Sequence, residues 1–139
     1  MKKITIILAS VMMSLMANSQ IQVSESKTER LTVSLTRSQT LSMFINEADT
    51  TFAFYYKNYE YKTITDIQYF SIEDKAELLS LLDLIEDVLV NKKEYNIKLT
   101  NGTQMKLSKV MGTCYIFTLK GHTYFDKKNL SKMREFVNK

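Results

Sequence analysis

Several residue types are scarce in this chain of 139 residues, and each scarcity excludes a class of protein. There is one cysteine, Cys114, so no intramolecular disulfide can form and packing must hold the fold. There is one histidine, His122, which leaves no His-rich or Cys-rich ligand set for zinc. The three glycines are isolated, so the chain has neither a glycine-rich phosphate loop nor a nucleophile elbow. We therefore expect no metal, no cofactor and no enzymatic activity.

An enzyme would have to be built on His122, with Asp126 to orient its ring or Cys114 as a nucleophile. Cys114 and His122 are eight positions apart, so they would have to face each other across a hairpin. We expect instead that Cys114 is a small buried strand residue and that His122 is structural.

The amino terminus has the pattern of a secretory signal peptide over residues 1–19. Two lysines precede an apolar run over residues 4–16, and small residues end the segment. We predict cleavage between Ser19 and Gln20. The apolar run is shorter than the roughly 20 residues of a membrane span. The chain also lacks proline and low-complexity tracts, so we expect a single secreted or periplasmic domain over residues 20–139, with no transmembrane segment after cleavage.

The mature chain alternates between strand and helix patterns, which predicts an α+β fold. We expect one mainly antiparallel sheet of six to eight strands, with helices over residues 71–91 and 127–138 packed on one face. Ser71 followed by Asp74 resembles a capping box and predicts the start of the first helix. Asp126 is the predicted N-cap of the second helix.

Each helix has an apolar stripe at helical spacing, which should face the core. In the first helix the stripe consists of Leu78, Leu81, Leu82, Ile85, Val88 and Leu89, and in the second of Leu130, Met133, Phe136 and Val137. The width of the first stripe also permits a homodimer. Tyr69-Phe70 precedes the first helix as Tyr124-Phe125 precedes the second, which is a weak sign of internal duplication.

A hairpin is predicted around Asn101-Gly102. A two-residue turn would place Ile97 opposite a lysine, whereas a three-residue loop with Gly102 in the left-handed conformation places Ile97 opposite Met105. We therefore predict the three-residue loop. In the strand that follows, we expect Tyr115, Phe117 and Leu119 to point inward.

Five residues are candidates for a binding surface, because tyrosine offers a rigid ring and a hydroxyl with little loss of side-chain entropy. The expected strand over residues 51–61 places Tyr55, Tyr59 and Tyr61 on one face with Lys57, opposite the face of Phe52, Phe54 and Tyr56. Tyr69 on the next strand extends the set.

The sequence therefore favours a small non-enzymatic binding protein that uses a tyrosine-rich sheet face, with an extracytoplasmic protein or glycan as its partner. Charge is divided unevenly, since residues 20–91 carry six basic and twelve acidic side chains and residues 92–139 carry eleven and three. This division predicts internal attraction between the two parts, or a basic face for an anionic partner. The alternative function is a periplasmic inhibitor or immunity-type protein that blocks an enzyme.

Strands with aromatic residues and Lys57, Lys62, Lys98 and Lys106 also match the general composition of single-strand nucleic-acid binders. The order of strands and helix superficially resembles the helix-capped modules of single-strand DNA-binding coactivators. Because the signal peptide would export the chain, we do not expect nucleic acid to be its partner.

Overall fold

The computed structural model describes residues 28–47, 49–63 and 65–139. The predicted signal peptide and the predicted cleavage site at Ser19 lie outside the described residues. Within the described part of the chain, no helix is long and apolar enough to span a bilayer.

The eight strands of the described residues form two antiparallel sheets, and each sheet is followed in the chain by one helix. Sheet A has the order β1 (Glu29–Thr36), β2 (Gln39–Ile45), β3 (Thr50–Lys57) and β4 (Ile67–Ile72), followed by α2 (Lys75–Asn91). Sheet B has the order β5 (Tyr95–Lys98), β6 (Gln104–Val110), β7 (Thr113–Thr118) and β8 (Gly121–Phe125), followed by α3 (Lys127–Val137).

The predicted α+β class with antiparallel strands and two helices is confirmed. The prediction of a single sheet of six to eight strands is not matched, because α2 interrupts the strand series and each half pairs only with its sequence neighbours. The order of four strands followed by a helix in the first half recurs in the second, as the weak sign of internal duplication in the sequence suggests.

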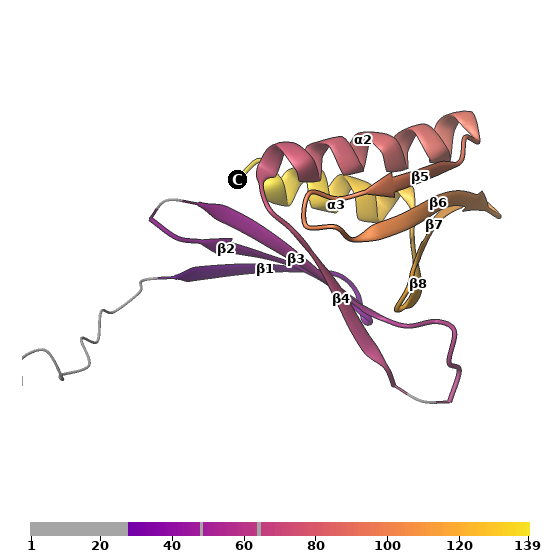
Figure 1. Cartoon of the computed structure of the whole chain (residues 1–139), viewed down its shortest axis with the longest axis horizontal. Coiled ribbons are helices and arrows are strands. Elements are labelled where there is room, and N and C mark those ends of the chain that lie inside the picture. The colour runs from indigo at the N-terminus through magenta and orange to yellow at the C-terminus, as the bar shows by residue number, and fades with distance from the viewer. Residues whose placement is uncertain (1–27, 48, 64) are drawn as a thin grey trace, which may run out of the picture.

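Figure 1 shows α2 and α3 together on one side of the molecule, with sheet A extending away below them. Both helices touch both sheets, since α2 contacts β3, β4, β6 and β7, and α3 contacts β1 and β8. We call the sheet faces turned toward the helices inner and the opposite faces outer. Buried residues of both halves form one hydrophobic core, in which the Phe54 and Phe125 rings meet edge-on at 4.8 Å.

The two helices bury the stripes that the sequence predicts. In α2 the buried residues are Leu78, Leu81, Leu82, Ile85, Val88 and Leu89. In α3 they are Leu130, Met133, Phe136 and Val137, together with Asn129. Asp126 caps α3 by accepting a hydrogen bond from the Asn129 amide at 2.8 Å, as predicted.

The predicted start of the first helix at Ser71 is wrong. Strand β4 continues to Ile72, which pairs with Phe52, so Ser71 is held in the sheet. The N-cap is Asp74, whose carboxylate accepts a hydrogen bond from the Glu77 amide at 2.7 Å. Glu77 in turn accepts from the Glu73 amide at 3.2 Å. The capping arrangement is therefore present, but three residues later than the sequence suggests.

The predicted hairpin between β5 and β6 is confirmed in register. Ile97 pairs with Met105 and Tyr95 pairs with Leu107. Gly102 has a φ of +89°, the left-handed conformation that the three-residue loop requires.

A buried polar cluster joins the two sheets to α3. The Gln39 side chain of β2 donates hydrogen bonds to the Thr123 hydroxyl at 2.7 Å and to the Tyr124 carbonyl of β8. Its carbonyl oxygen accepts from the Asn129 amide of α3 at 3.2 Å. Gln39, Thr123 and Asn129 are all buried, so this cluster fixes how the sheets meet.

Candidate functional site

The predicted tyrosine set is divided between two surfaces. Tyr55 and Tyr69 are cross-strand partners on the outer face of sheet A, with ring centroids 5.7 Å apart. The Arg30 guanidinium lies 5.9 Å from the Tyr55 ring centroid, and Tyr69 is 52% exposed. Lys57 ends β3 opposite Ile67 on the same face. Three of the five candidates therefore share a face as predicted.

Tyr59 and Tyr61 do not lie on that face, because β3 ends at Lys57 and the chain turns into a loop. The Tyr59 ring packs on Tyr124 of sheet B at 5.1 Å between centroids, and its hydroxyl bonds to Ser38. The neighbouring Tyr59 and partial burial raise the pKa of the Tyr124 phenol. Tyr61 is 47% exposed in the loop.

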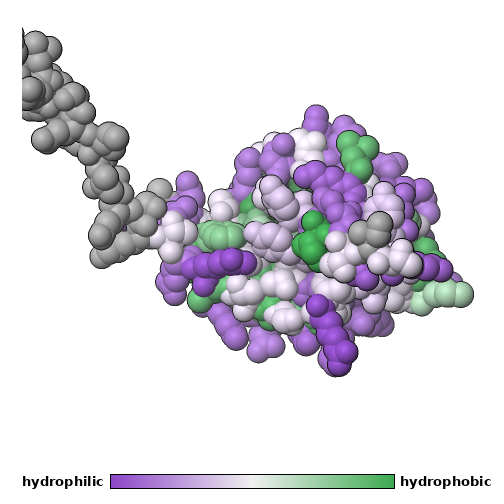
Figure 2. All heavy atoms as spheres, turned by 90° about the horizontal axis from the view of Figure 1, so that it is seen from below, coloured by the Kyte–Doolittle hydropathy of each residue, from purple (hydrophilic) through white to green (hydrophobic). Residues whose placement is uncertain are grey.

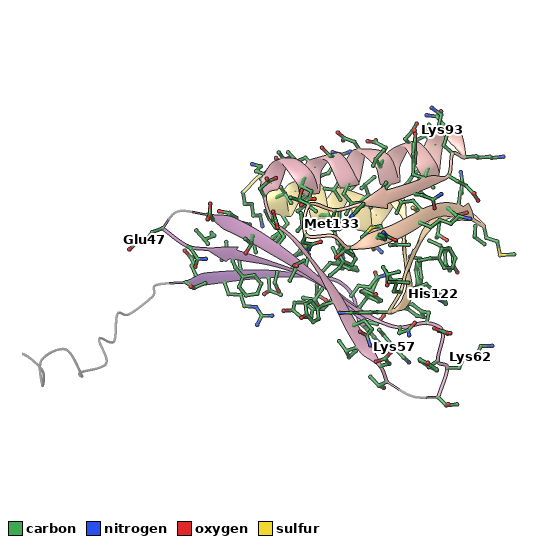
Figure 3. The ribbon with its side chains drawn as sticks, in the orientation of Figure 1. Glu47, Lys57, Lys62, Lys93, His122 and Met133 are labelled. Carbon is green, nitrogen blue, oxygen red and sulfur yellow. The ribbon has the colours of Figure 1, made fainter. Side chains whose placement is uncertain are left out.

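Asn58 is the residue that turns the chain away from sheet A. Its backbone amide donates to the Asp66 carbonyl at 2.7 Å, and its side-chain oxygen accepts from the backbone amides of Glu60 and His122. The Tyr59 amide also donates to the His122 carbonyl at 3.2 Å. The loop is thereby held against β8, and Figure 3 shows His122 with Lys57 and Lys62 in the lower part of the molecule, away from the helices.

The outer face of sheet B carries a second group of aromatic residues, part of which was expected on the inner face. The expectation that Tyr115, Phe117 and Leu119 point inward is wrong. Cys114 and Ile116 point into the core and are fully buried, whereas Phe117 is 39% and Leu119 96% exposed. Both sets are apolar and alternate with each other, so the strand pattern alone could not decide which one faces the helices.

The rings of this face are in contact with one another. Phe117 lies 6.0 Å from Tyr115 and 5.5 Å from His122 between ring centroids, and Tyr115 lies 5.9 Å from Tyr124. Together with Tyr59 they form one cluster, which we call the sheet B aromatic cluster. It consists of Tyr59, Tyr115, Phe117, His122 and Tyr124.

Two clefts lie near this cluster, and Phe117 lines the first of them. The first is an open groove of about 520 Å³, lined by Asn96, Ile97, Lys98, Gln104, Met105, Lys106, Phe117, Thr118 and Leu119. The second is a narrower cleft of about 320 Å³ between the sheets, lined by Tyr69, Phe70, Gly102, Thr103, Gln104, Thr118, Leu119 and Lys120. Gln104, Thr118 and Leu119 belong to both, so the two clefts form one surface that reaches from sheet B to Tyr69 of sheet A.

The combined surface is basic. Of the described residues that line the two clefts, three are lysines and none is acidic. The Lys120 ammonium lies 5.1 Å from the Tyr69 ring centroid, and the Lys106 ammonium lies 3.5 Å from Glu94 at the edge of the groove. Figure 2 shows the face opposite the helices, on which strongly hydrophobic residues appear as separate spots among polar and intermediate ones.

The residues considered for catalysis are not brought together. Cys114 faces the core, where burial raises its thiol pKa to about 12, while His122 lies on the outer face beside Phe117. Asp126 serves as the N-cap of α3. Within the described residues, no group of three or more His, Cys, Asp and Glu side chains is placed to hold a metal ion.

Searches of protein-family models, curated proteins and solved structures returned no match to the chain. We therefore infer the function from the geometry of the surface itself.

Ion pairs between the acidic and basic parts of the chain neutralise some of their charges. Arg134 of α3 contacts Asp83 at 2.7 Å and Glu86 at 2.8 Å on α2. Lys93 lies 3.7 Å from Asp87. These pairs fit the predicted internal attraction between the acidic and basic parts, although exposed pairs of this kind contribute only about 0–1 kcal/mol each. The lysines of the two clefts remain on the surface.

Proposed function

We propose that the protein is a small non-enzymatic binding protein that acts outside the cytoplasm and binds through the outer face of sheet B. Export follows from the signal-peptide pattern of residues 1–19. The observation that carries the binding proposal is the exposed pair Phe117 and Leu119, which lie between lysines in an open groove. Exposed apolar groups ringed by polar residues are typical of interaction sites.

The tyrosines singled out in the sequence support this surface at its margins. Tyr69 lines the cleft between the sheets, and Tyr59 belongs to the sheet B aromatic cluster through its contact with Tyr124. Tyr55, Lys57 and Tyr61 lie farther along sheet A or in the loop. We therefore expect Tyr59 and Tyr69 to contribute to binding, and Tyr55 to contribute less.

Affinity capture tests the proposal. The chain from Gln20 onward contains the hydrophobic core of the described residues, which lies between Leu35 and Val137. This chain is immobilised and exposed to the native periplasmic and secreted fractions. A Phe117→Ala variant and a Tyr55→Ala variant serve as test and matched control, because both remove one aromatic ring from an outer sheet face.

A component that is enriched by the parent chain and by Tyr55→Ala, but lost with Phe117→Ala, is the expected result. Enrichment that survives Phe117→Ala would place the binding surface elsewhere, and loss with Tyr55→Ala alone would return it to sheet A. If the enriched component is an enzyme that loses activity on binding, the inhibitor alternative replaces the simple binding role.

A further inference from the structure

Rows of paired residues cross the outer face of sheet B, and their members on β5, β6 and β7 line the groove. Asn96 of β5 pairs with Lys106 of β6, Lys106 pairs with Phe117 of β7, and Phe117 pairs with His122 of β8. Directly opposed residues on one face have Cβ atoms about 4.5–5.5 Å apart. The row therefore runs about 14 Å over four strands spaced by about 4.8 Å. A row of this length suits an extended chain better than a compact molecule.

A second row lies beside the first. Lys98 of β5 pairs with Gln104 of β6, and Leu119 completes this side of the groove. Lys120 follows in the turn between β7 and β8 and lines the adjoining cleft. Each row thus combines an amide side chain, an ammonium group and an apolar side chain.

These three chemical groups together select the ligand. An apolar or aromatic side chain can lie against the C–H face of a sugar ring, and an amide can both donate to and accept from neighbouring hydroxyls. A lysine ammonium is a point charge that can pair with a carboxylate without the bidentate geometry that arginine provides. No arginine, whose planar fork matches phosphate, is among the described residues that line the two clefts.

We propose that the ligand of this surface is an acidic oligosaccharide, which lies across the strands along Asn96, Lys106 and Phe117 and places its carboxylates at the lysines. This inference depends on the proposed function, because it names the ligand of the same surface. Export of the chain would also bring it to the compartment where acidic polysaccharides are found.

One carboxylate lies close enough to compete with the ligand. Glu94 contacts Lys106 at 3.5 Å and accepts a hydrogen bond from Ser108 at 2.8 Å. The side chains of Lys106 and Glu94 are 49% and 60% exposed, so the pair is well solvated and readily displaced. Removal of this carboxylate by Glu94→Gln should therefore strengthen binding of an acidic ligand.

Titration of the chain from Gln20 with defined probes tests the inference. The acidic probes are oligosaccharides of galacturonate, alginate and chondroitin sulfate, and the other probes are a neutral maltooligosaccharide, oligo(dT) and poly-glutamate. The test variant is Lys98→Gln/Lys106→Gln. Its matched control is Lys127→Gln/Lys128→Gln, which removes the same charge from exposed positions of α3. Circular dichroism verifies that each variant is folded.

Saturable binding of at least one acidic oligosaccharide is expected, at least about tenfold tighter than the neutral one. The Lys98/Lys106 variant should weaken it by about tenfold or more and the control by less than about twofold, while Phe117→Ala should weaken it about fivefold. Equal losses in the two lysine variants would reveal unspecific charge attraction and overturn the inference. Tighter binding of oligo(dT) or poly-glutamate would replace the glycan with a nucleic acid or an acidic peptide.

Binding of none of the acidic oligosaccharides would also overturn the inference. The proposed function would still stand in that case if the captured component continued to require Phe117. The two failures are therefore distinguishable.

Discussion

Replacement of Gly121 by alanine should break the contact that holds the loop after β3 against sheet B. A Cβ atom at this position would lie 2.1 Å from the Asn58 side-chain oxygen and 2.2 Å from its Cγ atom. Asn58 is buried, with 2% of its surface exposed, so its side chain cannot give way without a change in its packing and hydrogen bonds. Gly121 also has a φ of +115°, which L-residues rarely adopt.

The expected loss of stability has two parts. The positive φ costs about 1–2 kcal/mol for a residue with a side chain. Displacement of Asn58 would disrupt its hydrogen bonds to Asp66 and to the backbone amides of Glu60 and His122, which are 3.1–3.2 Å long. At about 0.5–1.5 kcal/mol per bond, the three bonds add about 1.5–4.5 kcal/mol, so we expect a total of about 2.5–6.5 kcal/mol.

Gly112→Ala is the matched control. Gly112 has a φ of +83°, but an added Cβ would meet no atom within 4 Å. Urea unfolding of both variants should therefore show Gly121→Ala to be less stable than Gly112→Ala by about 1.5–4.5 kcal/mol. In an Asn58→Ala background this difference should largely vanish. Equal destabilisation by the two glycine substitutions would refute the role of Asn58.

Three further predictions concern the cap, the thiol and the buried polar cluster. Asp74→Ala should destabilise the fold by about 1 kcal/mol in urea unfolding, because Asp74 is the N-cap of α2. Ser71→Ala should destabilise it by less than half of that, and a larger effect of Ser71→Ala would contradict Asp74 as the N-cap. The pKa of Cys114 is raised from 9.0 to about 12, so the folded state keeps a proton that the unfolded state loses, and stability should fall as pH rises from about 9 toward 12. Cys114→Ala should make this fall shallower without abolishing it, because the raised pKa of the Tyr124 phenol acts in the same direction, and an unchanged slope would contradict the role of the thiol. Gln39→Ala should lower the free energy of unfolding by about 2–3 kcal/mol in thermal or urea unfolding, because the buried Thr123 hydroxyl and the Asn129 side-chain amide would each lose a hydrogen-bond partner. A change below about 0.5 kcal/mol would show that the cluster does not hold the sheets together.

The sequence was sufficient where a local pattern had one consistent solution. The hairpin register followed from the requirement that Ile97 and Met105 share a face, and a left-handed residue was needed at Gly102. The stripe of α2 was equally clear, since its buried residues recur at helical spacing and acidic residues occupy much of the opposite side. Both features depend on neighbouring residues alone.

The sequence was insufficient where long-range pairing decided the outcome. Ser71 has the chemistry of a cap, but pairing of β4 with β3 keeps it extended and moves the cap to Asp74. The alternation that begins with Tyr55 appeared to continue to Tyr61, whereas Asn58 binds His122, 64 positions later, and ends the strand. No local signal reports a partner at that distance.

The sequence predicted an aromatic outer sheet face, but most of the candidate surface lies on other strands than expected. An aromatic outer face was expected on the strands near Tyr55, and Tyr69 does line one of the clefts. The larger groove lies on β5 to β7, where Phe117 was expected to be buried. Because Ile116 and Phe117 are both good core residues, only the packing of sheet B against the helices determines which of them remains outside.

NMR mapping of the bound ligand tests most directly whether ligand binds on the outer face of sheet B. Amide shifts of the ¹⁵N-labelled chain from Gln20 are followed during titration with the tightest-binding acidic oligosaccharide, or with the captured component if no such sugar binds. We expect saturable shifts concentrated at Lys98, Gln104, Lys106 and Phe117, as binding on this face requires. Shifts confined to the strands around Tyr55, with none in the sheet B groove, would contradict it.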